Sequence, residues 1–569
     1  MAISSLLPSL RASDRDTLIQ RITVLAFLGL FLVFFALPVA ALLYRSFTGE
    51  DGGFVGFDNY ASYVATSGFR ASVVNSLTVG VLTTFFALLL GFPFAYGLVR
   101  TCMPLRGLFR TLSMLPLLAP PMLFAISTRF LFNSQGPLNW VLGGQSIYGL
   151  AGIVMGEVFY AFPPVVLILM TGLATVDGRL IEVARSSGAS NRRIFTTVTL
   201  PAAKYALASA AIVAFIQSIT DFGIPKIIGG QYNVLATDIY KQVVGQMNFA
   251  MGAVVSVMML LPAIICFLLD RKIRSSQFST LSSQSVPHVP RPNTRFDRAM
   301  FAYCATISFA IVAFIAFAAY ISLVTYWPYD LVLTLAHYDF GAVDPRSAGA
   351  FVNSLYISMA SMFLGTIAAW SCAYFQTVTR NYLPSSLLDP LAVLPLSVPG
   401  LVLGLSYIVF FIHPANPLNG LYGSFALLVV SIVIHHFTIG YTISTVGLAQ
   451  IDNEIHSIGA CMGVPFYTTL RRVIVPVSLP VIFEVASYYF IVGMTTTSTV
   501  IFLYTPETIP ASVSILHLDE NGNLASAAAL SVVVFLTCLA VRCAQVVLCN
   551  GVLGRTQRWR NARSHVAGS

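Results

Sequence analysis

Long apolar stretches alternate with short polar connections along most of the chain. Segments such as 22–44 and 524–548 are almost continuously apolar and are flanked by arginines. A helix crosses a bilayer core of about 30 Å with about 20 apolar residues, and roughly a dozen stretches reach that length. Membrane barrel strands would instead be short and alternating in polarity. The pattern predicts an all-α polytopic membrane protein with about 12 transmembrane helices.

A polar segment, 275–298, separates two apolar blocks of similar length. It is rich in Ser, Pro and basic residues and lacks apolar periodicity, so it is predicted to be a linker. The first apolar stretch is about twice as long as the hydrophobic region of a signal peptide and has no small-residue cleavage site, so we expect it to be retained as the first helix. The predicted regions are a cytoplasmic tail at 1–20, a first transmembrane unit at 21–274, a cytoplasmic linker at 275–298, a second unit at 299–552 and a basic cytoplasmic tail at 553–569.

The two apolar blocks are related by an internal repeat. In the later part of each block, identical residues recur at an offset of 275 positions, and in the earlier part the offset is 278 or 279. The matched pairs include Gly172 with Gly447, Asp177 with Asp452, Gly188 with Gly463, Pro201 with Pro476, and Pro120 with Pro399. Because the matches keep their order along the chain, they indicate a duplication of one six-helix unit.

The basic residues predict the orientation, since short cytoplasmic loops carry an excess of Lys and Arg. With the N-terminus inside, all but six of the 31 Lys and Arg residues fall on the cytoplasmic side. The six exceptions are Arg45, Arg70, Lys226, Lys241 and Arg346 outside, and Arg129 within a helix. Both termini are therefore predicted to be cytoplasmic. The net charge of +9 is scattered over helix ends, which indicates membrane topology and not nucleic-acid binding.

A long polar loop in the first unit, 177–201, carries the clearest functional pattern. Asp177 can cap a helix, apolar residues follow at helical spacing, and Gly188 suits a helix end. A short amphipathic helix along the cytoplasmic membrane surface is predicted. The residues of interest in this loop are Asp177, Glu182, Ala184, Gly188, Ala189, Phe195 and Pro201.

This loop resembles the EAA loop of binding-protein-dependent ABC importers, whose pattern is Glu-Ala-Ala, three residues, Gly, nine residues, Ile, any residue, Leu-Pro. The spacing is complete, and the departures are Val183 and Val198. The resemblance implies that the loop docks into a groove of a separate ATPase. The second unit repeats the frame but has Ser457 at the position of Glu182, so we expect unequal ATPase contacts. Its docking residues are expected to be Asp452, Gly463, Val464, Pro465, Phe466 and Pro476.

The same resemblance implies partners and a location. The partners are an ABC ATPase dimer on the cytoplasmic side, which binds ATP-Mg, a periplasmic solute-binding protein, and the lipid of a bacterial inner membrane. The chain itself has no phosphate-binding G-x4-G-K-[S/T] pattern and no hydrolase signature, so it is expected to bind no cofactor and to be no enzyme. Fused units with the segment 221–225, Asp-Phe-Gly-Ile-Pro, most resemble ferric-iron and 2-aminoethylphosphonate permeases.

Ionisable residues in spanning helices are costly, so they are candidates for a substrate pathway. The alternative is hydrogen bonding between helices or snorkelling to the interface. Adjacent histidines on a helix point about 100° apart, so the His pair is not expected to ligate one metal ion. The candidates are Arg129, Glu157, Asp221, His435, His436 and Glu484.

Two other classes of protein share part of this pattern. An ion-coupled secondary transporter with two six-helix halves would have a similar number of crossings. Its signature loop would join the second and third helices, where segment 100–110 has no such motif. A membrane scaffold or receptor would have no reason to repeat a docking loop. The substrate stays open between ferric ion, 2-aminoethylphosphonate, a polyamine and another small polar solute.

Overall fold

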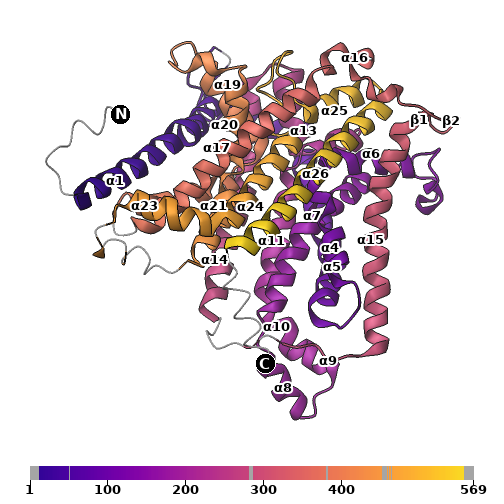
Figure 1. Cartoon of the computed structure of the whole chain (residues 1–569). Helices are drawn as coiled ribbons and strands as arrows, with labels where there is room; N and C mark the ends of the chain where they lie inside the picture. Colours follow the sequence, from indigo (N-terminus) through magenta and orange to yellow (C-terminus); the bar gives the residue numbers. More distant parts are fainter. Residues whose placement is uncertain are drawn as a thin grey trace.

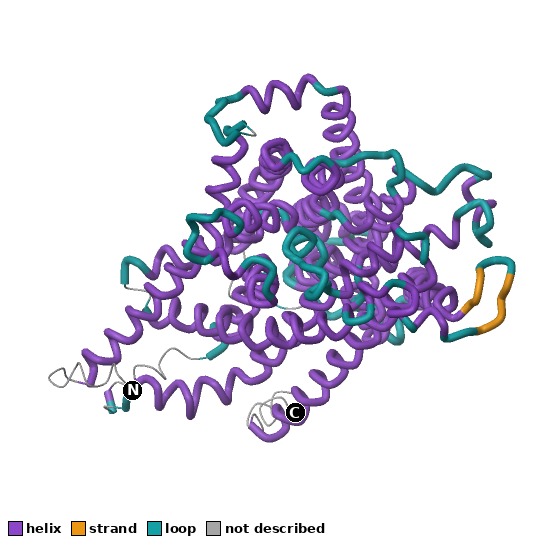
Figure 2. Tube along the Cα trace, turned by 90° about the horizontal axis from the view of Figure 1, so that it is seen from above, coloured by secondary structure: helices purple, strands orange, loops and turns teal. Residues whose placement is uncertain are grey.

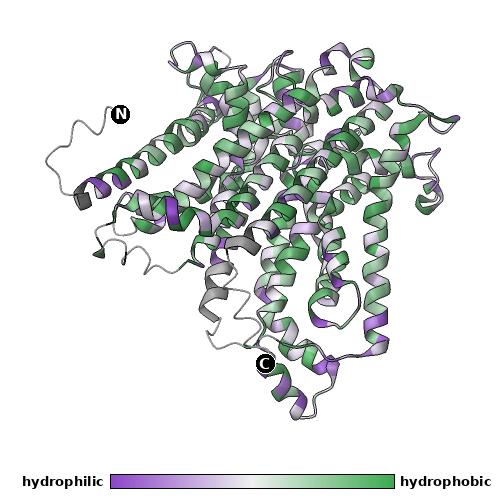
Figure 3. Cartoon of the chain, in the orientation of Figure 1, coloured by the Kyte–Doolittle hydropathy of each residue, from purple (hydrophilic) through white to green (hydrophobic). Residues whose placement is uncertain are grey.

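The computed structural model describes residues 12–556 except 50, 281–285, 287, 380–381, 452–457, 459–460 and 463. The predicted all-α fold is confirmed (Figure 1). One small exception is an antiparallel hairpin of β1 (Val324–Tyr326) and β2 (Asp330–Leu333), in which Val324 pairs with Leu333. Figure 2 shows this hairpin at the edge of the helical body. Most helices carry apolar residues along their length, while hydrophilic residues gather near helix ends and loops (Figure 3).

The first unit runs through α14. Its helices are α1 (Ala12–Phe31), α2 (Leu37–Ser46), α3 (Asp58–Ala65), α4 (Ser67–Arg100), α5 (Arg106–Ser113), α6 (Pro121–Phe132), α7 (Leu150–Ala174), α8 (Gly178–Ser186), α9 (Asn191–Ile194), α10 (Leu200–Ala202), α11 (Lys204–Thr220), α12 (Gly223–Ile228), α13 (Leu235–Tyr240) and α14 (Phe249–Thr280).

The second unit begins with α15. Its helices are α15 (Thr294–Leu323), α16 (Phe340–Val343), α17 (Ala350–Val378), α18 (Ser385–Val393), α19 (Gly400–Phe411), α20 (Phe425–His435), α21 (Phe437–Leu448), α23 (Phe466–Thr469), α24 (Val475–Thr495), α25 (Ala511–Glu520) and α26 (Leu524–Thr556). Helix α14 ends at Thr280 and α15 begins at Thr294, so helix extends into both ends of the segment 275–298 that was predicted to be a linker.

Eight helical stretches in the described part of the chain are long and apolar enough to cross a membrane, and up to 12 are if four sharply bent helix pairs each count as one span. Two of these bends occur at equivalent places. The break between α5 and α6 turns the chain by 97°, and the break between α18 and α19 turns it by 105°. Each break follows a Leu-Pro-Leu turn. Pro120 lies within the first break and Pro399 within the second. Proline has no amide proton and disfavours helix in the preceding residue, so it fixes both breaks.

The repeated glycines explain how the core of each unit closes. A Cβ atom on Gly172 of α7 would lie 2.1 Å from the Cβ of Ala206 in α11. A Cβ atom on Gly447 of α21 would lie 2.4 Å from Cγ2 of Val481 in α24. Ala206 and Val481 differ by the same offset of 275. The same close helix crossing is therefore built twice, and only glycine allows it at these positions.

The first helices are exchanged between the units. Helix α1 packs on α17 and α18 of the second unit, and α2 packs on α19. In return, α15 packs on α4, α5 and α6 of the first unit, where the hydroxyl of Tyr303 donates to the carbonyl of Leu90 at 2.8 Å. In Figure 1, α1 and α15 consequently lie on opposite flanks of the body. Two interlocked units result.

Candidate functional site

The predicted docking loop of the first unit forms a compact helical projection beyond the helix bundle. Helix α8 begins after Asp177, whose carboxylate accepts a hydrogen bond from the amide of Arg179 at 3.0 Å. The segment ends at Gly188, whose φ of +76° is left-handed, as expected for a helix-ending glycine. Figure 1 shows α8 and α9 at the lower end of the molecule, beyond the helix bundle. The predicted amphipathic helix is present.

The two faces of α8 have different surroundings. Ile181 is buried against Val176 and Ile194, with Ala184 and Ala189 packed on this small cluster. On the other face, Leu180 and Val183 are 56% and 64% exposed, and Glu182 is also exposed. Of the predicted docking residues, Glu182 and Gly188 are therefore available to a partner, whereas Ala184 and Ala189 support the loop from inside.

Phe195 connects this loop to the spanning helices. Its ring lies 5.7 Å from Tyr96 and 6.1 Å from Phe92, both on α4, measured between ring centroids. Pro201 follows within α10, directly before α11. The loop therefore contacts α4 and leads directly into α11. Phe195 is half-buried between the loop and α4, and its docking role stays a prediction.

The second docking loop is described only in its later part. Asp452 and Gly463 lie outside the described residues. Val464, Pro465 and Phe466 are half-buried, and the Phe466 ring packs 6.4 Å from that of Phe375 on α17. Pro476 occupies the first turn of α24, as Pro201 does in α10. The equivalent connection from loop to spanning helix is thus present in both units.

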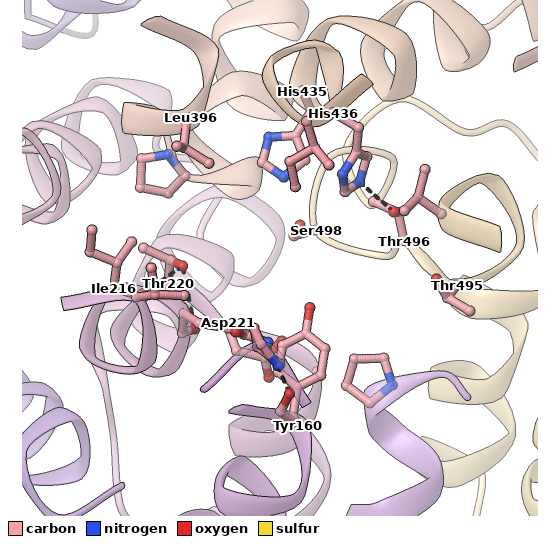
Figure 4. A pocket seen from close by; sticks show the side chains of 18 of the residues that line it. Tyr160, Ile216, Thr220, Asp221, Leu396, His435, His436, Thr495, Thr496 and Ser498 are labelled. Atoms are coloured by element: carbon pink, nitrogen blue, oxygen red, sulfur yellow. Dashed lines mark hydrogen bonds between the residues drawn. The ribbon is translucent and has the colours of Figure 1, made fainter. Parts of the chain in front are cut away.

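A cavity of about 370 Å³ lies between the two units. Figure 4 shows its wall: Tyr160, Thr220 and Asp221 from the first unit face His435, His436 and Thr496 from the second. The lining positions repeat with the offset of the duplication. The equivalent lining pairs are Leu117 with Leu396, Ala119 with Val398, Tyr160 with His435, Pro164 with Ile439, Val213 with Tyr488, Gln217 with Val492, Thr220 with Thr495, Asp221 with Thr496 and Gly223 with Ser498.

Hydrogen bonds orient the polar groups of the cavity. The Asp221 carboxylate accepts from the amide of Ile224 at 2.8 Å. His436 uses both ring nitrogens, with Nδ1 3.0 Å from the Tyr488 hydroxyl and Nε2 2.9 Å from the Thr496 hydroxyl. The Nδ1 atom of His435 is buried and has no hydrogen-bond partner among the described residues. The acid is thus held on one side and the imidazole network on the other.

The six predicted pathway residues occupy different places. Asp221, His435 and His436 line the cavity. Glu157 is fully buried and interacts with the carboxylate of Asp221. Arg129 and Glu484 lie in ion pairs away from the cavity wall. Their partners are Asp519 and Arg542, each 2.9 Å away.

Several lining residues were missed in the sequence. The largest omission is the polar run 495–498, Thr-Thr-Thr-Ser, at the end of α24. It matches Thr220 and Asp221 through the offset of 275, so the repeat itself could have identified it. Tyr160 and Tyr488 were missed because a tyrosine in an apolar helix gives no sign of which way its hydroxyl points. Among the described residues, no group of three or more His, Cys, Asp and Glu side chains could hold a metal ion.

Comparisons with known proteins agree with the duplicated architecture. The ferric transport system permease protein FbpB of Actinobacillus pleuropneumoniae is 25% identical over 482 residues, covering 81% of this chain and 68% of that protein. The molybdenum transport system permease protein ModB of Azotobacter vinelandii is 32% identical over 164 residues, covering 28% of this chain and 73% of that protein.

A crystal structure of a bacterial ABC transporter involved in the import of the acidic polysaccharide alginate covers 47% of this chain and 98% of that chain, with 17% identity and a TM-score of 0.36. The family described as the binding-protein-dependent transport system inner membrane component matches twice, at residues 87–275 and 345–552. The two matches fall one in each unit and together include more than half of the chain. The chain is therefore a member of this family, a membrane permease of ABC importers with two fused permease units.

Proposed function

We propose that this permease imports a small cation, with ferric iron as the favoured substrate, delivered by a periplasmic solute-binding protein. An ABC ATPase dimer binds the two docking loops and supplies the energy by hydrolysing ATP-Mg. Both termini are cytoplasmic in this proposal, which places α8 and α9 on the side of the ATPase. Membership of an importer family supports this proposal over an ion-coupled secondary transporter.

The chemistry of the cavity carries the choice of a cation. Its wall presents the carboxylates of Asp221 and Asp270 together with the imidazoles of His435 and His436. Carboxylates in a low-dielectric cavity attract cations and repel oxyanions. Of the described residues that line the cavity, none is a lysine or an arginine. An oxyanion such as a phosphonate or molybdate would be better served by such cationic groups.

Similarity to the ferric permease gives independent support. That relative matches 81% of this chain, across both units, whereas the molybdenum permease matches 28%. Carboxylate, phenol and imidazole groups are also the side chains that bind hard or borderline metal ions. The residues on the wall thus fit passage of a metal cation between the units.

Transport in a reconstituted system tests the substrate. The chain would be purified with the ATPase and the binding protein encoded beside it and placed in proteoliposomes. We expect ATP-dependent uptake of ferric ion, with little or no uptake of molybdate or 2-aminoethylphosphonate. Spermidine serves as a second, organic cation. Uptake of either oxyanion in preference to both cations would overturn the cationic assignment.

A glycine substitution tests the docking loop. Gly188 is exposed, has positive φ and has open space where a Cβ would lie. Leucine at this position would project from the proposed ATPase contact, so Gly188→Leu should reduce co-purification of the ATPase at least about tenfold, a loss of about 1.4 kcal/mol. Gly143→Leu is the matched control, because Gly143 also has positive φ and open surroundings but lies in the loop between α6 and α7. Equal loss in both variants would contradict docking through α8.

A further inference from the structure

Each docking loop contacts the segment at which the first helix of the other unit begins, here called the first-helix segment: Asp16 in α1, and the linker residues Val286 and His288 ahead of α15. Asp16, on α1 of the first unit, contacts the docking loop of the second unit. The residues that precede α15 of the second unit contact the docking loop of the first unit. Each attachment therefore joins residues near the start of one unit to the loop of the other, as the exchanged helices α1 and α15 do. Both attaching segments lie outside residues 87–275 and 345–552, where the family matches.

The attachment to the first docking loop consists of two hydrogen bonds at the start of α8, one between backbone groups and one from a backbone amide to a carboxylate. The amide of Gly178 donates to the carbonyl of Val286 at 2.8 Å. The amide of Val286 donates back to Oδ1 of Asp177 at 3.3 Å, the same oxygen that caps α8. The segment before α15 is therefore bound to the first turn of the docking helix.

A close backbone approach makes this attachment dependent on glycine. A Cβ atom on Gly178 would lie 2.9 Å from Cα of His288 and 3.2 Å from the carbonyl oxygen of Val286. Both are backbone atoms, which cannot rotate away as a side chain can. Any side chain at position 178 must therefore push the segment away from α8.

The same segment is also bound to the turn between α4 and α5. The amide of Cys102 donates to Oδ1 of Asp297 at 3.1 Å, and its thiol donates to the carbonyl of Pro290 at 3.3 Å. Asp297 lies in the first turn of α15. Described residues ahead of α15 and in its first turn are thus bound both to α8 and to the turn between α4 and α5.

The attachment to the second docking loop uses different chemistry. Oδ2 of Asp16 accepts a hydrogen bond from the amide of Phe466 at 2.9 Å. Phe466 is the first residue of α23, so its amide is one of the donors that a helix start leaves without an intrahelical partner. A carboxylate is favourable there, because helix N-termini carry partial positive charge. Further along α1, the guanidinium of Arg21 lies 5.2 Å from the ring centroid of Tyr382.

We propose that the first-helix segment of each unit positions the docking loop of the other unit and moves with it. Asp16 and Gly178 are positioning residues: they hold the loops at the angle from which ATPase closure is passed to the helices. The proposal rests on the proposed function, because it takes these loops to be the ATPase contacts. One attachment uses the carboxylate of Asp16 and the other the backbone of Gly178 and Val286, so the two were not inherited as one repeated sequence motif.

The ratio of ATP hydrolysed to solute imported tests this proposal, because a purely structural contact would lower both rates together. Asp16→Ala removes the acceptor for Phe466, whereas Asp16→Asn keeps an acceptor oxygen. Gly178→Ala introduces the backbone clash, and Gly107→Ala is its control, since a Cβ on Gly107 would meet nothing within 4 Å. All variants would be measured as the full complex with ATPase and binding protein in proteoliposomes.

We expect Asp16→Ala and Gly178→Ala each to raise the ATP consumed per solute at least threefold, with the ATPase still co-purifying. Asp16→Asn and Gly107→Ala should keep the wild-type ratio. An unchanged ratio in Asp16→Ala, which loses a single hydrogen bond and is expected to fold, would overturn the proposal. Failure of the wild-type complex to import solute or to bind the ATPase would instead count against the proposed function.

Discussion

The two walls of the central cavity occupy equivalent positions but carry different chemistry. Where the first unit has Tyr160 and Asp221, the second has His435 and Thr496 at the same offset of 275. Asp221 and Thr496 directly follow α11 and α24, the helices that take part in the close glycine crossing of each unit. Duplication has therefore kept the frame, while the side chains that face the cavity have diverged into an acidic wall and an imidazole wall.

This difference bears on how a single solute passes between two similar halves. In a symmetric homodimer, both walls would present the same ligands, and an acidic pair would meet across the cavity. Here the carboxylate of Asp221 faces a network in which His436 binds both Tyr488 and Thr496. A cation can consequently interact with an anion on one side and with neutral donors or acceptors on the other, without two carboxylates opposing each other.

The largest expected effect follows from removing the charge on the acidic wall. Asp221→Asn keeps an acceptor for the amide of Ile224 but loses the negative charge, so cation uptake should fall about a hundredfold, or about 2.7 kcal/mol. The measurement is the initial rate of ATP-dependent uptake in proteoliposomes. The removed charge can then be restored at the equivalent position, with Thr496→Asp added to Asp221→Asn. Partial recovery is expected, and no effect of Asp221→Asn would remove Asp221 from the pathway.

A smaller effect is expected from disturbing the frame that the two units share. Gly172→Ala should destabilise the fold by about 2 kcal/mol, because the new methyl group would overlap the Cβ of Ala206, which cannot rotate away. Gly447→Ala should cost a similar amount, since the new methyl group would lie within 3.0 Å of both methyls and the Cβ of Val481, and a β-branched side chain cannot turn all three away. Thermal unfolding of the purified chain in detergent measures both.

Two further variants separate the effect of the close crossing from the general effect of adding a methyl group. Ala206→Gly combined with Gly172→Ala should recover most of the lost stability, because it moves the small residue to the facing helix. Gly29→Ala, on α1, is the control, since a Cβ there would meet nothing within 4 Å. Unchanged stability of Gly172→Ala or Gly447→Ala would show that the helix crossing does not require glycine at that position.

Much of the frame could be predicted from the sequence, because helix length, proline breaks and the repeat are local or periodic features. The proline breaks before α6 and α19 and the glycine pair fall where the repeat places them. The exchange of α1 and α15 could not be predicted, since a helix that packs on the other unit is as apolar as one that packs on its own. The family matches residues in both units, in agreement with the repeat.

The pathway residues were harder to predict, because an ionisable residue in a spanning helix can face a cavity or a partner. Asp221 and the His pair line the cavity, while Arg129 finds its partner Asp519 at a distance of 390 residues along the chain. No local pattern reveals such a pairing. For the predicted docking loop, the sequence predicted the short helix α8 but could not separate the exposed Glu182 from the half-buried Ala184.

The smallest expected effect concerns the ion pair that joins the units near α25. Asp519 forms an ion pair with Arg129. Its equivalent in the first unit, at the offset of 275, is Val244, so the first unit has no corresponding carboxylate. Asp519 lies in α25, outside the candidate spans, and its side chain is only 9% exposed. Burial raises the pKa of Asp519 from 3.8 to about 6, although the nearby Arg129 opposes this rise.

Because this pKa is higher in the folded than in the unfolded chain, the folded state binds more protons between about pH 4 and pH 6. The contribution of Asp519 to stability is therefore full at low pH and is lost as the pH rises through 6. We expect wild type to lose about 1 kcal/mol of stability relative to Asp519→Asn when the pH is raised from 5 to 7. Unfolding in detergent at both pH values measures the difference, and Val244→Asn is the matched control in the first unit. A pH dependence that is the same in wild type and Asp519→Asn would show that burial of Asp519 does not govern this interface, and that the ion pair alone sets its strength.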